Sequence, residues 1–193
     1  SGAIELIGHH RYGYMARIQD ELTPYFLRRY KPLYPNRVSL DPNRPPQVHW
    51  HMRPTRPVYP GYDYAFEMGG VEFVVIAPEN GGEGEDGVLV WLPESKILFT
   101  GDLFGPLYPM FPNLYTIRGT GYRNVRAWVA SLDRMRQLAP EHLVPSHTRP
   151  LSGAEDIQAV LTDYRDAIQF VHDQTIRGMN QGLTADELAS RIA

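Results

Sequence analysis

The sequence predicts an α/β (α+β) fold, and three features carry that prediction. Residues 71–77 (VEFVVIA) and 88–92 (VLVWL) are rich in β-branched and aromatic residues, and a short turn joins the second run to ILFTGD at 97–102. This pattern predicts a hairpin of buried strands. Residues 123–138 place apolar side chains on one helical face, and a short apolar run at 143–147 follows. Strands followed by a helix and a further strand indicate a layered α/β domain.

The N-terminal part predicts fewer regular elements. AIELI at 3–7 has the character of a strand, and an amphipathic run that extends to residue 30 predicts helix. Residues 31–60 are rich in proline, which can neither donate a backbone hydrogen bond nor sit inside a helix without disrupting it. We therefore expect an extended connection with little regular structure there.

Two capping boxes predict helices in the C-terminal part. Ser152 followed by Glu155 would open a long helix, and apolar residues continue at helical spacing until Gly182. Thr184 followed by Glu187 would open a second helix, DELASRIA, which runs to the last residue.

Composition argues against several classes of function. The net charge is −3 and the 19 Lys and Arg residues are scattered, which argues against a nucleic-acid-binding surface. There is no cysteine, so any bound metal must be held by histidine and carboxylate. No apolar run approaches the ~20 residues that span a bilayer. We expect a soluble protein, which could be located in the cytoplasm or in the periplasm.

Potential metal ligands follow the predicted strands. Asp102 comes directly after ILFTG, and His147 ends the apolar run at 143–147. Because α/β proteins gather ligands at the carboxyl ends of strands, these two side chains are candidates for one site. An aspartate in this place is also typical of a turn or a helix cap. The glycine-rich loop at 78–85 could bring a further acid to the same edge, from Glu79, Glu83 or Glu85.

Other histidines are weaker candidates. His49 and His51 would point to one face of a strand, but no Asp-His follows them and their surroundings are rich in proline. We interpret this pair as unrelated to metal binding. Three further histidines are interpreted as structural: His9, His10 and His172.

Several motifs together resemble one enzyme family. The run VLVWLPESKILFTGD resembles the metallo-β-lactamase superfamily, in which such a hairpin ends in an aspartate that bridges two metal ions. PSHTRP at 145–150 resembles the last metal-binding histidine of that superfamily. NLYTIRG at 113–119 and FVHDQTIRGMNQGLTADELA at 170–189 resemble its alkyl sulfatases. The resemblance covers residues 71–193.

This resemblance implies an architecture. The fold would be the metallo-β-lactamase αβ/βα sandwich, of which we expect this chain to form the C-terminal portion. Residues 1–151 would be a partial metallo-β-lactamase-like domain. Residues 152–193 would be a helical segment leading toward a dimerisation domain, which implies a homodimer.

The resemblance also implies a metal site. Asp102 would be the catalytic carboxylate that bridges two zinc ions, and Glu83 and His147 would be further ligands. Glu85 and Glu79 stay open as alternatives to Glu83, because the glycine loop could slide by two residues. Manganese or iron could take the place of zinc.

A substrate site is implied by NLYTIRG. Asn113 and Arg118 fall on the sulfate-contacting asparagine and arginine of the alkyl sulfatases, and Tyr115 lies between them. An arginine fork suits a tetrahedral anion. Alkyl sulfatases usually carry glutamate where this chain has Asp102, so a small ester or lactone is open as substrate beside a sulfate ester.

The HxHxDH motif, which supplies most nitrogen ligands in the superfamily, is absent from these 193 residues. We expect a missing N-terminal half or a second chain to complete the site, and residues 71–102 to pair with strands of that partner. The sequence thus favours a metal-dependent hydrolase acting on a small-molecule ester. The alternative is a non-catalytic metallo-β-lactamase-like module for assembly.

Overall fold

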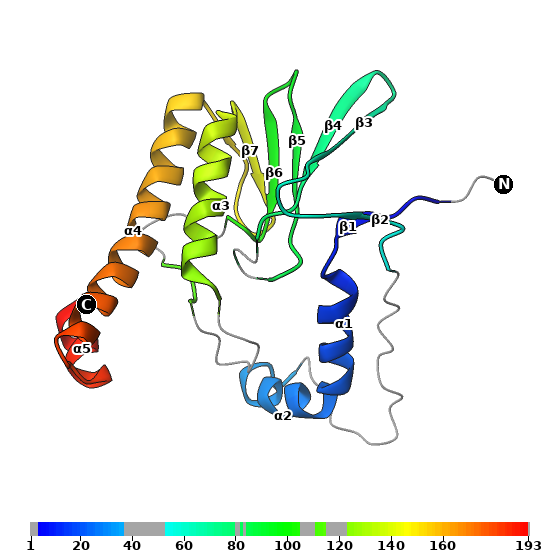
Figure 1. The fold of residues 1–193 in the computed structure, drawn as a ribbon. Coiled ribbons are helices and arrows are strands. Elements are labelled where there is room, and N and C mark those ends of the chain that lie inside the picture. Colours follow the sequence, from blue (N-terminus) through cyan, green and yellow to red (C-terminus); the bar gives the residue numbers. More distant parts are fainter. Residues whose placement is uncertain are drawn as a thin grey trace.

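The computed structural model describes residues 4–36, 53–79, 82, 84–104, 111–114 and 123–192. A six-stranded sheet forms its centre (Figure 1). In their order across the sheet the strands are β3 (Tyr64–Met68), β4 (Val71–Ile76), β5 (Leu89–Leu92), β6 (Ile97–Gly101), β7 (His142–Pro145) and β8 (Leu151–Ser152). Neighbouring strands are antiparallel except β6 and β7, which run parallel. The predicted α/β fold class is confirmed.

The predicted hairpin is formed by β5 and β6. Trp91 lies opposite Leu98 in its register, and both are buried, as is Leu89. Lys96 closes the turn with a φ of 49°. Because side chains alternate along a strand, Phe99 points to the opposite face, where it is 41% exposed. The hairpin is therefore fully buried on one face only.

Two predicted helices, α3 (Val125–Leu138) and α4 (Ala154–Asn180), cover one face of the sheet (Figure 1). The α3 helix begins after Asn124, whose Oδ1 accepts a hydrogen bond from the backbone N–H of Ala127 at 3.1 Å. Both helices share one core with the sheet, made of Trp128, Leu132, Met135, Ile157, Leu161, Tyr164, Ile168, Leu89, Leu98 and Leu143 among others. Within the described ranges, none of the helices has the length and apolar character that crossing a bilayer requires.

The α4 helix begins differently from the prediction. Ser152 does not cap it, since Ser152 belongs to β8 and pairs with His142. The serine hydroxyl instead lies 2.9 Å from Nδ1 of that histidine. Gly153 takes the N-cap position with a φ of 107°. The second capping box is confirmed at α5 (Ala185–Ile192), because the carboxylate of Glu187 accepts the backbone N–H of Thr184 at 2.8 Å.

The N-terminal elements also differ from the prediction. The strand expected at 3–7 lies at Ile7–His9 (β1), and it pairs in parallel with Arg56–Val58 (β2), inside the stretch expected to be irregular. The expected helix is two helices, α1 (Tyr12–Glu21) and α2 (Thr23–Leu33). They separate at Leu22 because Pro24 favours the first turn of a new helix.

The face of the sheet opposite α3 and α4 is covered only in part. Ile7 of β1 and Val58 of β2 pack there against Val75, Ala77 and Val88 in a second, smaller core. This contact places β1 and the start of α1 beside the end of β4, where the loop toward β5 begins.

Candidate metal centre

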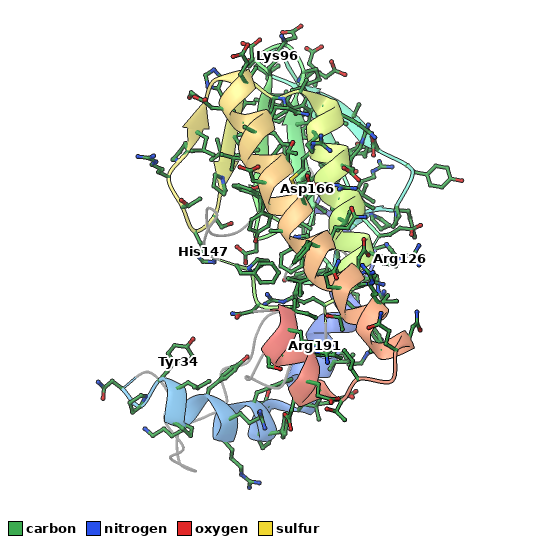
Figure 2. All side chains as sticks on the ribbon, turned by 90° about the vertical axis from the view of Figure 1, so that its left-hand side faces the viewer. Tyr34, Lys96, Arg126, His147, Asp166 and Arg191 are labelled. Atoms are coloured by element: carbon green, nitrogen blue, oxygen red, sulfur yellow. The ribbon has the colours of Figure 1, made fainter. Side chains whose placement is uncertain are left out.

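Three strands end at one edge of the sheet. β4 and β6 are both antiparallel to β5, so they run in the same direction, and β7 is parallel to β6. We call the edge at which they end the carboxyl edge; Asp102 and His147 follow β6 and β7 there. Figure 2 shows His147 at a different end of the sheet from Lys96, which precedes β6. Ligands in α/β proteins collect at such an edge.

Asp102 and His147 come together at the carboxyl edge. Nε2 of His147 lies 3.2 Å from Oδ1 of Asp102, and the two side chains are 71% and 45% exposed. Gly101 turns the chain out of β6 with a φ of 55°, a conformation that favours glycine. The carbonyl of Gly101 accepts the backbone N–H of Ser146 at 3.2 Å, which aligns the two strand ends. The pair offers a carboxylate and an imidazole, both donor types that zinc accepts.

Glu79 and Glu85 lie in the loop between β4 and β5, on which the third carboxylate was predicted. Glu79 is exposed beyond the end of β4. Oε2 of Glu85 lies 2.7 Å from Nη2 of Arg11 in an ion pair. This oxygen is shielded from solvent and has no well-aligned hydrogen bond. The positive charge of the Arg11 guanidinium therefore offsets the cost of burying this oxygen. The Glu85 carboxylate is thus already neutralised by a cation.

Gly82 packs this loop against the residue that follows Asp102. Its φ is 86°, and a Cβ placed on it would lie 2.6 Å from Cδ2 and 3.0 Å from Cα of Leu103. Leu103 is buried, so it could not move aside to make space for a Cβ. Both the backbone conformation and the close approach therefore require glycine. The glycine-rich composition of the loop indicated that its backbone comes close to another part of the chain. The sequence did not indicate that this part is Leu103.

The remaining predicted residues are only partly described. Glu83, Tyr115 and Arg118 lie outside the described residues, as do His49 and His51. Within the ranges that the structure describes, no group of three or more potential metal ligands gathers. Asp102 and His147 therefore stand as a pair.

Asn113 is exposed and held through its backbone. Its carbonyl accepts a hydrogen bond from Nη1 of Arg123, a buried residue just before α3. The Arg123 guanidinium also lies over the ring of Trp128, 5.7 Å from its centre. This anchors the chain at position 113, while contact of Asn113 with substrate stays a prediction.

His9 is buried, and both of its ring nitrogens are engaged. Nδ1 accepts the backbone N–H of Arg11 at 3.2 Å, so the ring proton lies on Nε2, which donates to the carbonyl of Pro78 at 3.1 Å. Burial lowers the pKa of His9 from its ordinary 6.5. His9 is structural, as the sequence indicated. His172 lies within α4, where its Nδ1 is 2.9 Å from Oδ1 of Asp173.

The lowered pKa of His9 predicts that stability depends on pH. Below pH 6.5 the unfolded chain protonates His9 while the folded chain resists it, so the free energy of unfolding falls as the pH falls. We expect the thermal midpoint to drop less between about pH 7 and about pH 5 in His9→Gln than in the parent chain. Equal slopes for His9→Gln and the parent would contradict this account.

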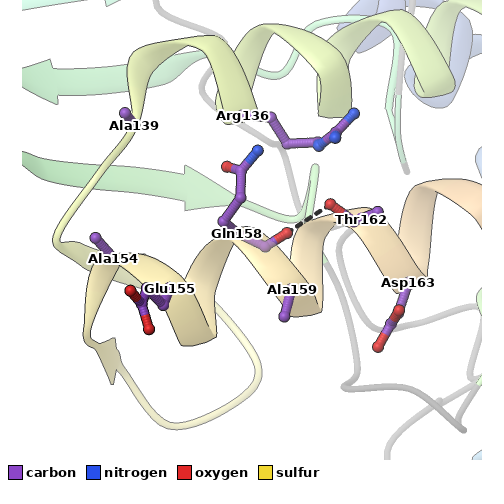
Figure 3. A pocket seen from close by; sticks show the side chains of 8 residues that line it. All are labelled: Arg136, Ala139, Ala154, Glu155, Gln158, Ala159, Thr162 and Asp163. Atoms are coloured by element: carbon purple, nitrogen blue, oxygen red, sulfur yellow. Dashed lines mark hydrogen bonds between the residues drawn. The ribbon is translucent and has the colours of Figure 1, made fainter.

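A cavity of about 610 Å³ lies between the end of α3 and the first turns of α4 (Figure 3). Its lining consists of Arg136, Ala139, Ala154, Glu155, Gln158, Ala159, Thr162 and Asp163. The hydroxyl of Thr162 donates to the carbonyl of Gln158 at 2.6 Å, within the helix. Because α3 ends just before the first residue of β7, the cavity lies away from the carboxyl edge. It contributes nothing to the Asp102 and His147 pair.

Comparisons with known proteins agree on one superfamily. The family model "Metallo-beta-lactamase superfamily" matches residues 9–147, a range that contains Asp102 and His147. Linear primary-alkylsulfatase from a Pseudomonas species is 42% identical over 110 residues, which are 57% of this chain and 20% of that protein. Alkyl/aryl-sulfatase BDS1 from Saccharomyces cerevisiae is 31% identical over 127 residues, which are 64% of this chain and 19% of that protein.

Solved structures agree with the sequence matches. The stereoselective inverting sec-alkylsulfatase Pisa1 from a Pseudomonas species is 28% identical with a TM-score of 0.60, and the match covers 72% of this chain and 22% of that one. The chain spans about a fifth of the length of the curated relatives that it matches. The predicted fold and the resemblance to alkyl sulfatases are both confirmed.

Proposed function

The chain belongs to the metallo-β-lactamase superfamily, and on this premise we propose that it forms part of a metal-dependent hydrolase of the alkylsulfatase type. The reaction is hydrolysis of a sulfate ester or another small ester. The observation that carries the proposal is the 3.2 Å approach of His147 Nε2 to Asp102 Oδ1 at the carboxyl edge. Similarity to a linear primary-alkylsulfatase supports the substrate class.

The proposed ligands from this chain are Asp102, His147 and Glu83. Two contacts support Glu83 over its neighbours in the loop. Glu85 is engaged with Arg11, and taking it as a ligand would leave that guanidinium without its ion pair. Gly82, which directly precedes Glu83, packs on Leu103, which directly follows Asp102. Glu79 is less suited as a ligand. It directly follows β4, which is separated by β5 from β6, the strand that Asp102 follows.

These donors suit a borderline divalent metal. Carboxylate oxygen and imidazole nitrogen fit zinc, and manganese and iron accept the same donors. Two bound zinc ions would lower the pKa of a water molecule to about 7 and polarise the ester. Asp102 would be the carboxylate shared between the two ions. Both Asp102 and His147 are accessible to solvent, so they can bind a cation without any change in the core.

A dinuclear site needs more ligands than this chain offers. We propose that a segment carrying HxHxDH, which is absent from these 193 residues, supplies them. That segment would belong to an N-terminal part of the same protein or to a second chain. The lack of this motif is also the observation that favours the competing function, a non-catalytic module for assembly.

Metal content and sulfate release from the complete protein test this proposal. We expect about two equivalents of zinc, manganese or iron per protomer after gel filtration and release of inorganic sulfate from alkyl sulfates. A complete protein that holds no metal and releases no sulfate would instead favour the non-catalytic module. Turnover of small esters or lactones without turnover of alkyl sulfates would keep the hydrolase and change the substrate.

Recognition of the anion is assigned to Arg118, with Asn113 and Tyr115 beside it in the sequence. We expect Arg118→Ala to raise KM for sulfate esters about tenfold or more, because it removes a bidentate charged contact, while KM for neutral esters changes little. Steady-state kinetics on an anionic and a neutral ester check this. Unchanged KM values for both substrates in the variant would rule out an anion-binding role.

A further inference from the structure

The loop between β4 and β5 is held by the segment from β1 to the start of α1. His9 is 1% exposed, and its Nε2 donates to the carbonyl of Pro78, the residue from which the loop departs. The ring cannot rotate freely, because Nδ1 accepts the backbone N–H of Arg11. One buried side chain thus ties the beginning of the loop to the beginning of α1.

A second contact holds the other side of the loop. Nη2 of Arg11 lies 2.7 Å from Oε2 of Glu85, an oxygen that is shielded from solvent. Because Arg11 directly follows the segment that His9 anchors, the two contacts share one support. They contact the loop at Pro78 and at Glu85, which precede and follow Glu83 in the sequence.

A third contact directs the loop toward Asp102. Gly82 lies against Leu103 so closely that a Cβ would fall 3.0 Å from the Cα of that residue. The loop therefore contacts His9 and Arg11 through Pro78 and Glu85, and it contacts the chain that follows Asp102 through Gly82. Among the described residues of the loop, Pro78, Gly82 and Glu85 each contact one of these two neighbours.

From this arrangement we infer that His9 and Arg11 are positioning residues for the metal centre. They act through the loop, by holding Pro78 and Glu85 in place while Gly82 lies against Leu103, the residue after Asp102. The inference rests on the proposed function, in which Glu83 is a ligand. Supporting contacts that orient metal ligands commonly change metal affinity by about 10- to 100-fold when they are lost.

Zinc affinity of the complete protein tests the inference. We expect His9→Leu and Arg11→Met each to weaken zinc binding about tenfold or more in competition with a chromogenic chelator. His9→Gln keeps an N–H donor for the carbonyl of Pro78 and should recover most of the affinity. Arg56→Met is the matched control, since it removes an ion pair of the same kind, to Glu5 at 2.9 Å, on the neighbouring strand and away from the loop.

Hydrogen exchange of the metal-free protein gives a second readout that does not depend on zinc. Amides of residues 79–86 should exchange faster in His9→Leu and Arg11→Met than in the parent or in Arg56→Met. If His9→Leu fails to fold, Arg11→Met still decides the question, because the side chain of Arg11 is 36% exposed and lies outside the buried core. Parental zinc affinity and parental exchange in Arg11→Met would overturn the inference while leaving the hydrolase intact. A parent protein that binds no zinc would overturn the proposed function itself.

Discussion

Replacing Asp102 by alanine in the complete protein is expected to abolish hydrolysis of its ester substrates. In the proposed site Asp102 would be shared by both metal ions, so its loss would weaken the binding of both. Loss of a ligand to a single ion would weaken the binding of that ion first. A bound metal supplies several kcal/mol of transition-state stabilisation, which corresponds to a loss of activity of about a thousandfold or more. Sulfate release and metal content of the purified variant measure the effect.

Folding should survive this change. The side chain of Asp102 is 45% exposed and its polar partner His147 is 71% exposed, so the free energy of unfolding should change by no more than about 1 kcal/mol. Asp166→Ala is a suitable control, because it removes an exposed carboxylate that pairs with Arg165 at 2.6 Å on α4. An Asp102→Ala protein that retains both its metal and its turnover would exclude the assigned role.

The sequence predicted best those elements that face a single core. Leu89, Trp91 and Leu98 alternate toward α3 and α4, and the apolar positions of α3 repeat every three or four residues toward the same core. Such patterns are local and can be recognised without knowing the partner. The hairpin, both helices and the strand before His147 follow from them.

The N-terminal strand was misplaced for a physical reason. Ile4 is 83% exposed, and the backbone N–H of Leu6 donates to the side chain of Thr55 at 2.8 Å, so these residues have the composition of a strand without its pairing. The actual strand forms where β2 offers a partner, 49 residues along the chain. The β3 strand was missed although Gly69-Gly70, both at positive φ, mark the turn that joins it to β4.

The candidate site was predictable to the extent that strand direction determines it. Asp102 and His147 follow strands that turned out to be parallel neighbours, so their meeting follows from topology. The contacts of Arg11 with Glu85 and of Gly82 with Leu103 join distant parts of the chain through tertiary packing. No local pattern marks Arg11, which is why its role emerged only from the structure.

The last prediction concerns the open face of the sheet. The expectation that residues 71–102 pair with strands of a partner is wrong in its mode of contact, because β4, β5 and β6 are each hydrogen-bonded on both sides within this chain. A partner could instead contact the face of the sheet that lies opposite α3 and α4. Phe99 lies opposite Val90 on one side and Val144 on the other, so these three side chains form an apolar row on the face away from α3 and α4.

We expect the isolated 193-residue chain to cover this row by associating with a second copy. The far part of α4 would add contact area, since Phe170, Ile176 and Met179 are exposed there, in the segment proposed to lead toward a dimerisation domain. Burying one large apolar side chain contributes about 1.5–3 kcal/mol, and Phe99 is 41% exposed at the centre of the row. Size-exclusion chromatography with light scattering should therefore give at least the mass of a dimer.

Substitutions on the face identify which surface drives this association. Phe99→Ser should weaken self-association about tenfold or more, because it removes the centre of the apolar row. Tyr62→Ser should leave association unchanged, since Tyr62 is 78% exposed at the turn before β3 and belongs to neither surface. Association that persists in Phe99→Ser but is lost in Phe170→Ser would assign it to α4 instead. A parent chain that is a monomer at all concentrations and melts cooperatively would show that the sheet needs no partner on this face.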